Sequence, residues 1–245
     1  MNSRPDYAVK VRMKSTTLAF AFCALLAPAV ASADTEHVTR TIPLAPGGTL
    51  RLRTFSGRVT ITASDVSEVS VDAVRRAPSD RLRRITLDVH ADGSTVVVDA
   101  NHREPSWFDM RNNVVETDLD IKVPRRTSLD LNTFSAPITV DGVEGSYKIH
   151  GFSSRIRLNN AAGSVQAHTF SGSVEIHAAR WLDPETIDID TFSGNVELRV
   201  PEDARGAVTF NSFSGRLDSV LPLMMHSTSR RSIRADLGSG GSNSR

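Results

Sequence analysis

Cysteine is almost absent from this chain of 245 residues. The single cysteine, Cys23, lies in an apolar stretch near the N-terminus, so no disulfide can form within one chain. Aromatic residues are also few, at 6% of the chain, and six of the ten phenylalanines stand in copies of one short motif. Such a chain has to stabilise its fold by a hydrophobic core and by hydrogen bonds between strands.

Catalytic motifs are missing as well. The sequence has no H-E-x-x-H zinc motif, no G-x-S-x-G nucleophile elbow and no Walker glycine–lysine loop. The serine of the repeated motif has no histidine at a fixed spacing, so we interpret it as a turn residue and not as a nucleophile. We therefore expect a protein with no enzymatic activity and no cofactor.

The N-terminal residues have the three parts of a secretory signal. An apolar run of ten residues (18–27) is too short to span a bilayer, and four basic residues precede it: Arg4, Lys10, Arg12 and Lys14. A small-x-small site, Ala31-Ser32-Ala33, follows. This pattern predicts a signal peptide over residues 1–33 and export to the periplasm or cell surface, without a transmembrane span after cleavage. An uncleaved anchor helix is the alternative.

Neither sign of charge dominates the remaining chain. Beyond residue 33 it keeps 25 basic and 27 acidic residues, which are mixed along the sequence. A nucleic-acid partner would require a basic face, and nothing in this mixed distribution of charge suggests one. We expect instead a protein or glycan partner in the cell envelope.

The sequence repeats the tetrad Thr-Phe-Ser-Gly, intact at residues 54–57, 169–172 and 191–194 and in looser form at 133–136, 151–154 and 212–215. From the second copy onward, the spacing between phenylalanines is 18, 18, 22 and 21 residues. A period near 20 residues is typical of a solenoid, in which each repeat is one supersecondary unit stacked on the next. The repeated phenylalanines are Phe55, Phe134, Phe152, Phe170, Phe192 and Phe213.

Apolar residues alternate on both sides of each tetrad, which predicts two strands with one buried face each. Before Phe192 these residues are Ile187 and Ile189, and after it they are Val196 and Leu198. The two flanks are out of phase by one residue, so the tetrad is interpreted as a corner between two sheets. We expect the phenylalanine to fill the interior of that corner. An antiparallel meander with hairpins at Ser-Gly is the alternative.

These patterns divide the chain into four parts. After the signal peptide, residues 34–128 are expected to form a smaller, mainly antiparallel β region, with a hairpin at Asp92-Gly93. Residues 129–237 are expected to form a right-handed parallel β-solenoid, whose apolar residues after 220 serve as a C-terminal cap. Residues 238–245 are a Gly/Ser-rich tail that is expected to be disordered.

Two outward columns of the solenoid are candidate binding patches. His150, His168 and Asp190 lie two residues before successive phenylalanines, so stacking places them about 4.8 Å apart. They are potential ligands of a divalent metal, although a strand face would hold them in a line, and a solvated polar ladder is the simpler interpretation. A second column, five residues after the phenylalanines, contains Glu175, Glu197 and Asp218. Neighbouring carboxylates of this kind repel one another unless a cation binds or solvent screens them.

The repeats, together with the run Asp118–Pro124 before them, resemble the bacterial putative-adhesin family of β-strand-repeat proteins, a domain of unknown function. The similarity extends over residues 50–245. It implies an exported, non-enzymatic β-solenoid of the cell envelope that acts as an adhesin or as a binding or scaffold module. A β-helix that binds or cleaves polysaccharide is the alternative. It would need convergent carboxylates, for which Asp183, Glu185, Asp188 and Asp190 are the candidates.

Overall fold

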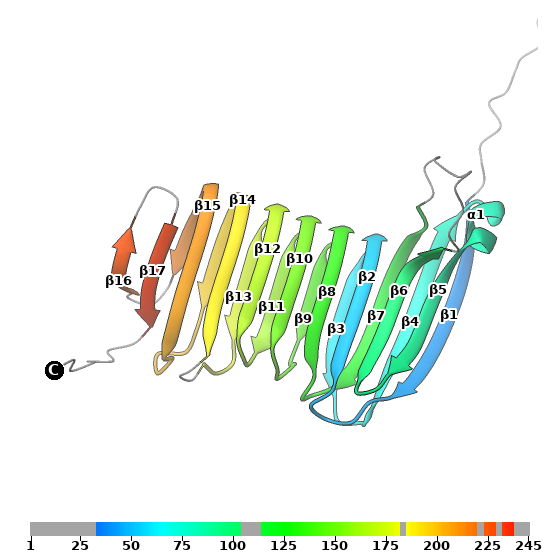
Figure 1. Cartoon of the computed structure of the whole chain (residues 1–245), viewed down its shortest axis with the longest axis horizontal. Helices are drawn as coiled ribbons and strands as arrows, with labels where there is room; N and C mark the ends of the chain where they lie inside the picture. Colours follow the sequence, from blue (N-terminus) through cyan, green and yellow to red (C-terminus); the bar gives the residue numbers. More distant parts are fainter. Residues whose placement is uncertain (1–32, 104–113, 182–184, 220–222, 229–231, 238–245) are drawn as a thin grey trace, which may run out of the picture. The chain divides into compact units, whose positions relative to one another are not determined.

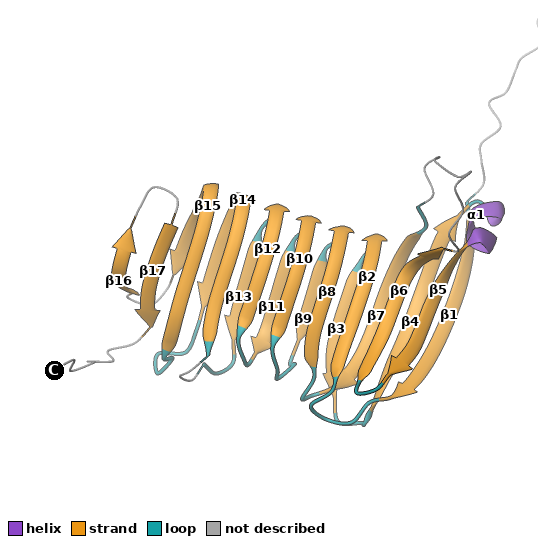
Figure 2. Ribbon diagram, in the orientation of Figure 1, coloured by secondary structure: helices purple, strands orange, loops and turns teal. Residues whose placement is uncertain are grey.

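The computed structural model describes residues 33–103, 114–181, 185–219, 223–228 and 232–237. These residues form an all-β unit of mostly parallel strands, which confirms the fold class expected from the alternation (Figures 1 and 2). The predicted signal peptide and the predicted tail lie outside the described residues, apart from Ala33. Among the described residues, no helix has the length and hydropathy needed to cross a bilayer.

Each tetrad lies between two strands that stack on the equivalent strands of the next repeat. The strands before the tetrads are β2 (Thr49–Ser56), β8 (Ser128–Ser135), β10 (Tyr147–Ser153) and β12 (Val165–Ser171). The strands after them are β3 (Val59–Ser64), β9 (Ile138–Asp141), β11 (Ile156–Ala161) and β13 (Val174–Ala178). β14 (Thr186–Arg199) and β15 (Gly206–Ser219) run through the corner, so each belongs to both sheets.

The pairing is parallel and keeps the repeats in register. Thr54 pairs with Thr133, Thr169 with Thr191, and Thr191 with Ser212. Because β14 and β7 (Glu116–Pro124) each pair into both sheets, the hydrogen bonds close a ring of ten strands, β2-β8-β10-β12-β14-β13-β11-β9-β3-β7. Apolar side chains from both sheets fill the space between them as one core. The described residues thus form solenoid-like stacked coils.

The N-terminal strands extend this stack and do not form a separate antiparallel region. β2 and β3 pair in parallel with β8 and β9, and β6 (Thr95–Arg103) pairs in parallel with β2. The expected division at residue 128 therefore does not coincide with a break in the sheets, because the first tetrad stacks directly on the second. Among the described strands up to β7, antiparallel pairing joins β1 (Asp34–Pro43) with β4 (Glu68–Ala77), β4 with β7, and β5 (Ile85–Asp92) with β6 in the predicted hairpin. α1 (Ser79–Arg84) precedes β5.

At the other end of the stack, β17 (Ser232–Leu237) pairs antiparallel with β15 and with β16 (Leu223–Thr228). β17 covers only the part of β15 between Gly206 and Asn211. Ala235 is buried and Ile233 packs against the core. The segment that was expected to cap the last coil therefore adds a strand along the edge of one sheet.

The phenylalanines of the tetrads point outward, so their predicted place in the interior is wrong. Their exposed fractions range from 38% for Phe55 to 53% for Phe213. The alternation continues through the preceding residue, and this places Thr169 and Thr191 inside at 5% and 4% exposure. The chain turns after the phenylalanine, at Ser-Gly. The inner corner thus holds a hydroxyl side chain instead of an aromatic ring.

In one coil a different residue supplies the hydroxyl group of the inner corner. Gly151 stands where its neighbours have threonine, while Ser154 stands where most other repeats have glycine. Ser154 is 2% exposed, and its hydroxyl lies 2.9 Å from that of Thr133. A Cβ at Gly151 would come within 3.1 Å of the Ser154 Cβ. The serine therefore fills the space left by the missing threonine side chain.

Close contact between coils explains the glycine that ends the tetrad. A Cβ on Gly172 would lie 2.0 Å from the carbonyl oxygen of Ser154, and one on Gly194 would lie 1.8 Å from that of Gly172. Both distances are far below van der Waals contact, and both obstacles are backbone atoms. A side chain at these positions would separate adjacent coils.

Candidate functional site

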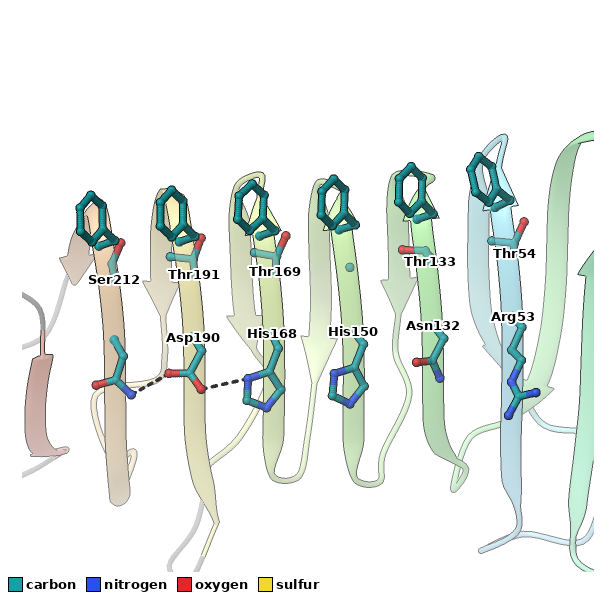
Figure 3. A pocket seen from close by; sticks show the side chains of 18 of the residues that line it. Arg53, Thr54, Asn132, Thr133, His150, His168, Thr169, Asp190, Thr191 and Ser212 are labelled. Atoms are coloured by element: carbon teal, nitrogen blue, oxygen red, sulfur yellow. Dashed lines mark hydrogen bonds and ion pairs between the residues drawn. The ribbon is translucent and has the colours of Figure 1, made fainter. Parts of the chain in front are cut away.

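Six aromatic rings form a continuous exposed strip along one side of the stack. We call Phe55, Phe134, Phe152, Phe170, Phe192 and Phe213 the Phe strip (Figure 3). Consecutive ring centroids are 4.5–5.0 Å apart, and the interplanar angles are 1–15°. The ring planes are therefore nearly parallel, and each ring covers part of the next. Scattered exposed apolar residues are common in proteins, whereas a contiguous apolar patch of this kind usually marks an interaction site.

A row of polar side chains runs beside the strip on the same face of the sheet. We call Arg53, Asn132, His150, His168, Asp190 and Asn211 the polar column. Each stands two residues before a phenylalanine, and therefore points to the same side of its strand. Parallel pairing then aligns these residues from one coil to the next, as Figure 3 shows.

Hydrogen bonds order the second half of the polar column. Asn211 Nδ2 donates to Asp190 Oδ1 at 2.6 Å, and Asp190 Oδ2 lies 2.9 Å from His168 Nδ1. The His168 ring in turn stacks on that of His150, with centroids 5.1 Å apart. Burial lowers the pKa of His150 below its ordinary value of 6.5, and the charges of His168 and Lys148 lower it further. The neutral imidazole is therefore favoured at His150.

The Phe strip and the polar column line a groove with a volume of about 910 Å³. Asp99 and Asn101 of β6 also line it. Because Arg53 pairs with Asp99 in parallel register, Asn101 stands level with Phe55 in the next rung. The row of aromatic rings thus ends at a polar residue on this side. Arg53 makes no ion pair or hydrogen bond within the described part of the chain.

The first predicted patch is brought together in the groove, but in a line. His150, His168 and Asp190 occupy successive rungs, as the register requires. Over the residues that the structure describes, no group of three His, Cys, Asp or Glu side chains is placed to hold a metal ion. The contacts of Asp190 with His168 and Asn211 match the alternative of a polar ladder.

The second predicted patch lies on the other sheet. Glu175 is paired with Glu197, and Glu197 with Asp218, in the backbone register. Arginines offset the first two charges, since Arg157 Nε donates to Glu175 at 2.7 Å and Arg199 Nε to Glu197 at 2.6 Å. The hydrogen bond from Arg157 also lowers the pKa of Glu175. Glu175 and Glu197 therefore need no bound cation to lie in neighbouring rungs.

The carboxylates considered for polysaccharide cleavage do not form a described catalytic pair. Asp183 lies outside the described residues. Asp188 and Asp190 are on the same face of β14, and both oxygens of Asp190 are already in contact with His168 or Asn211. The groove itself was not predicted. The signal for it was the inward threonine of each tetrad, since strict alternation places the following phenylalanine outside.

Several solved structures resemble the chain at low sequence identity. A putative cell adhesion protein from Clostridium sporogenes is 9% identical with a TM-score of 0.46, covering 86% of this chain and 91% of its own. A putative adhesin from Bacteroides fragilis is 15% identical with a TM-score of 0.31, covering 75% and 96%. A putative lipid binding protein from Parabacteroides distasonis is 11% identical with a TM-score of 0.23, covering 75% and 96%. Likenesses of this size do not indicate a function for the chain.

No curated protein matches the chain in sequence. A protein-family model described as Toastrack DUF4097 matches residues 118–244, which is just over half of the chain. The match begins at Asp118, where the run before the second tetrad begins. The chain therefore belongs to the Toastrack DUF4097 family, in agreement with the resemblance that its repeats indicated.

Proposed function

We propose that this protein is an exported, non-enzymatic binding module of the cell envelope, built on a right-handed β-solenoid, and that it binds its partner in the groove along the Phe strip. The right hand follows from the strong preference of parallel crossover connections. The observation that carries the proposal is the unbroken row of six half-exposed aromatic rings. Covering these rings removes apolar surface from water, so the strip offers a ready source of binding free energy.

A binding role is favoured over catalysis by the chemistry of the groove. Its lining contains no cysteine or lysine, and its two carboxylates are Asp99 and Asp190. Asp190 is in contact with His168 and Asn211, while Asp99 accepts a hydrogen bond from the backbone N–H of Asn101. No pair of groups is arranged as a nucleophile and its base. The groove is thus better suited to hold a molecule than to convert it.

The polysaccharide alternative has less support. Each aromatic ring of the strip covers part of its neighbour, since the centroids are 4.5–5.0 Å apart. A flat sugar ring would therefore find only part of each aromatic face free for stacking. A glycan panel screened for both binding and cleavage tests this alternative, and a specific hit that is lost with the strip would favour it.

The groove is tested by replacing two central rings. Asn101 already occupies the equivalent slot in β6, so Phe152→Asn together with Phe170→Asn introduces a residue that this slot accommodates. Val66→Asn is the control, because Val66 is an exposed apolar residue outside the groove at 50% exposure. Immobilised wild-type protein and the control should retain the same component of an envelope extract, and the double variant should lose it. Equal retention by all three would show that the strip is not the binding surface.

Export is tested separately. The N-terminal sequence of the protein from cells that express it should begin at Asp34, because the predicted cleavage follows Ala33. A cytoplasmic protein that keeps its first 33 residues would contradict export, whatever the groove binds.

A further inference from the structure

The Phe strip has no pockets between its rungs. Its rings are nearly parallel, and their centroids are at most 5.0 Å apart. An extended peptide gains specificity by placing alternate side chains in separate pockets, and a helix does so with anchors on successive turns. A smooth, continuous apolar strip instead matches a partner without side chains. A polymethylene chain has that property.

The length of the strip sets the length of such a chain. Five steps of 4.5–5.0 Å give about 24 Å between the first ring and the last. An extended alkyl chain advances roughly 1.3 Å per carbon, from a C–C bond of about 1.5 Å. The strip thus spans about 18 carbons.

The ends of the groove differ in chemistry, and this gives the chain a direction. At the β2 end the aromatic row stops at Asn101, and Arg53 is a cation without a partner in the described part of the chain. Asp99 is beside it, and its carboxylate accepts the backbone N–H of Asn101 at 3.0 Å. Each end of the groove thus contains an aspartate, but Arg53 is the one arginine or lysine among the residues that line the groove. A negatively charged head group therefore fits best at Arg53.

A second copy of this chain is a poorer occupant. Two copies related by a twofold axis would bring both polar columns, which contain Arg53 and Asp190, toward the contact, and burying charged side chains is costly. A bilayer is also a poorer fit, because its surface is broad, whereas the strip is one ring wide and has the polar column beside it. A single alkyl chain lying along the groove meets neither objection.

We propose that the groove binds a single-chain anionic amphiphile, such as a long-chain fatty acid, with its alkyl chain extended along the Phe strip and its carboxylate at Arg53. This inference rests on the proposed function and adds the chemical class of the ligand. Binding requires no chemical step. The alkyl chain displaces water from the ring edges, and the charged head group is left at the polar end of the groove.

The test measures affinity for saturated fatty acids of 10 to 20 carbons, delivered from cyclodextrin to the purified protein. Affinity should rise about twofold per methylene, because a methylene on an open strip is about half buried. The rise should stop near 18 carbons, where the strip ends. Phe152→Asn with Phe170→Asn should weaken binding at least tenfold, while Val66→Asn should leave it unchanged.

The head group is tested with Arg53→Gln. This variant should weaken binding of the acid about three- to fivefold and leave the alcohol of equal chain length unaffected, because only the acid carries a charge. A loss of both ligands alike would overturn the assigned direction. Affinity that keeps rising up to 20 carbons, or is independent of chain length, would overturn the extended chain along the strip.

Two further outcomes separate this inference from the proposed function. If the protein retains an envelope component through the Phe strip but binds no fatty acid, the ligand class is wrong and the binding role stands. If the protein sediments with phosphatidylglycerol vesicles but does not bind monomeric fatty acid, the ligand is a lipid surface and not a single alkyl chain. If nothing is retained through the strip and no fatty acid binds there, both proposals fail.

Discussion

The cost of removing one ring of the Phe strip tests its placement directly. Phe170 is 48% exposed, and its ring stacks between those of Phe152 and Phe192 at 5.0 and 4.8 Å. If about half of an aromatic surface of ~200 Å² is covered, the transfer contribution at ~25 cal/mol per Å² is about 2.5 kcal/mol, an upper bound. Phe170→Ala should therefore lower the free energy of unfolding by about 2 kcal/mol.

A buried residue of the same coil provides the comparison. Ile176 is fully buried and lies between Leu158 and Leu198 in the second sheet. Its replacement by alanine leaves a cavity, for which about 4 kcal/mol is expected. Removing an aromatic ring buried in the interior would lower the free energy of unfolding by as much or more.

Urea unfolding followed by circular dichroism measures both variants against the wild type. The midpoint should fall less for Phe170→Ala than for Ile176→Ala, with unchanged slopes. Equal or larger destabilisation by Phe170→Ala would refute the outward placement of the ring. A loss below about 0.5 kcal/mol would show instead that neighbouring rings do not cover it.

Three other changes test the coils, the groove and the edge. Gly194→Ala should lower the free energy of unfolding in urea by about 3 kcal/mol or more, because its Cβ would lie 1.8 Å from a backbone carbonyl oxygen. Gly93→Ala has open space around it and should lower the free energy of unfolding by only about 1–2 kcal/mol, because of its positive φ. The pKa of His150 is lower in the folded protein than in the unfolded chain, so on acidification the imidazole is protonated in the unfolded state at a higher pH than in the folded state. Lowering the pH from above to below 6.5 should therefore reduce the free energy of unfolding more for the wild type than for His150→Asn. Equal losses would contradict a shielded imidazole. Deleting residues 223–245 removes β17 from the edge of β15 and should cause association in light scattering, while an unchanged monomer would show that this edge needs no cover.

The regular parts of the fold follow from local patterns in the sequence. Alternating residues such as Ile187 and Ile189 predict a strand with one buried face, and their recurrence every 18 to 22 residues predicts parallel stacking. Structure and sequence agree here because each strand is defined by its own residues and the stacking repeats one contact. The same locality made the hairpin at Asp92-Gly93 predictable, since its signal lies within the turn.

The orientation of the phenylalanines was harder to predict, because hydrophobicity and alternation disagree at this residue. Burial of apolar surface places a phenylalanine inside, whereas the alternation from Ile189 through Thr191 places Phe192 outside. The backbone pattern wins, because the inner corner is narrow and already holds the Thr191 side chain. The place of Asn101 at the end of the strip could not be predicted at all, since it depends on the pairing of β6 with β2.

Differences between the outward columns indicate that strand formation itself does not require phenylalanine in an outward position. Four residues before the phenylalanines, the column on the same face carries both signs of charge and neutral side chains: Arg51, Asp130, Lys148, Gln166, Asp188 and Thr209. The strands therefore form whatever stands in an outward position. A threonine or valine would supply the same β-propensity in the phenylalanine slot with less exposed apolar surface.

Six coils nevertheless carry the same aromatic residue in that slot, and the row stops at Asn101. Contacts that end within one coil would not require the same residue in the next. A ligand that lies across the coils would, because one polar side chain in the row would leave part of the ligand without an apolar partner. Ring stacking between coils favours this uniformity, and the proposed long and unbranched ligand would require it.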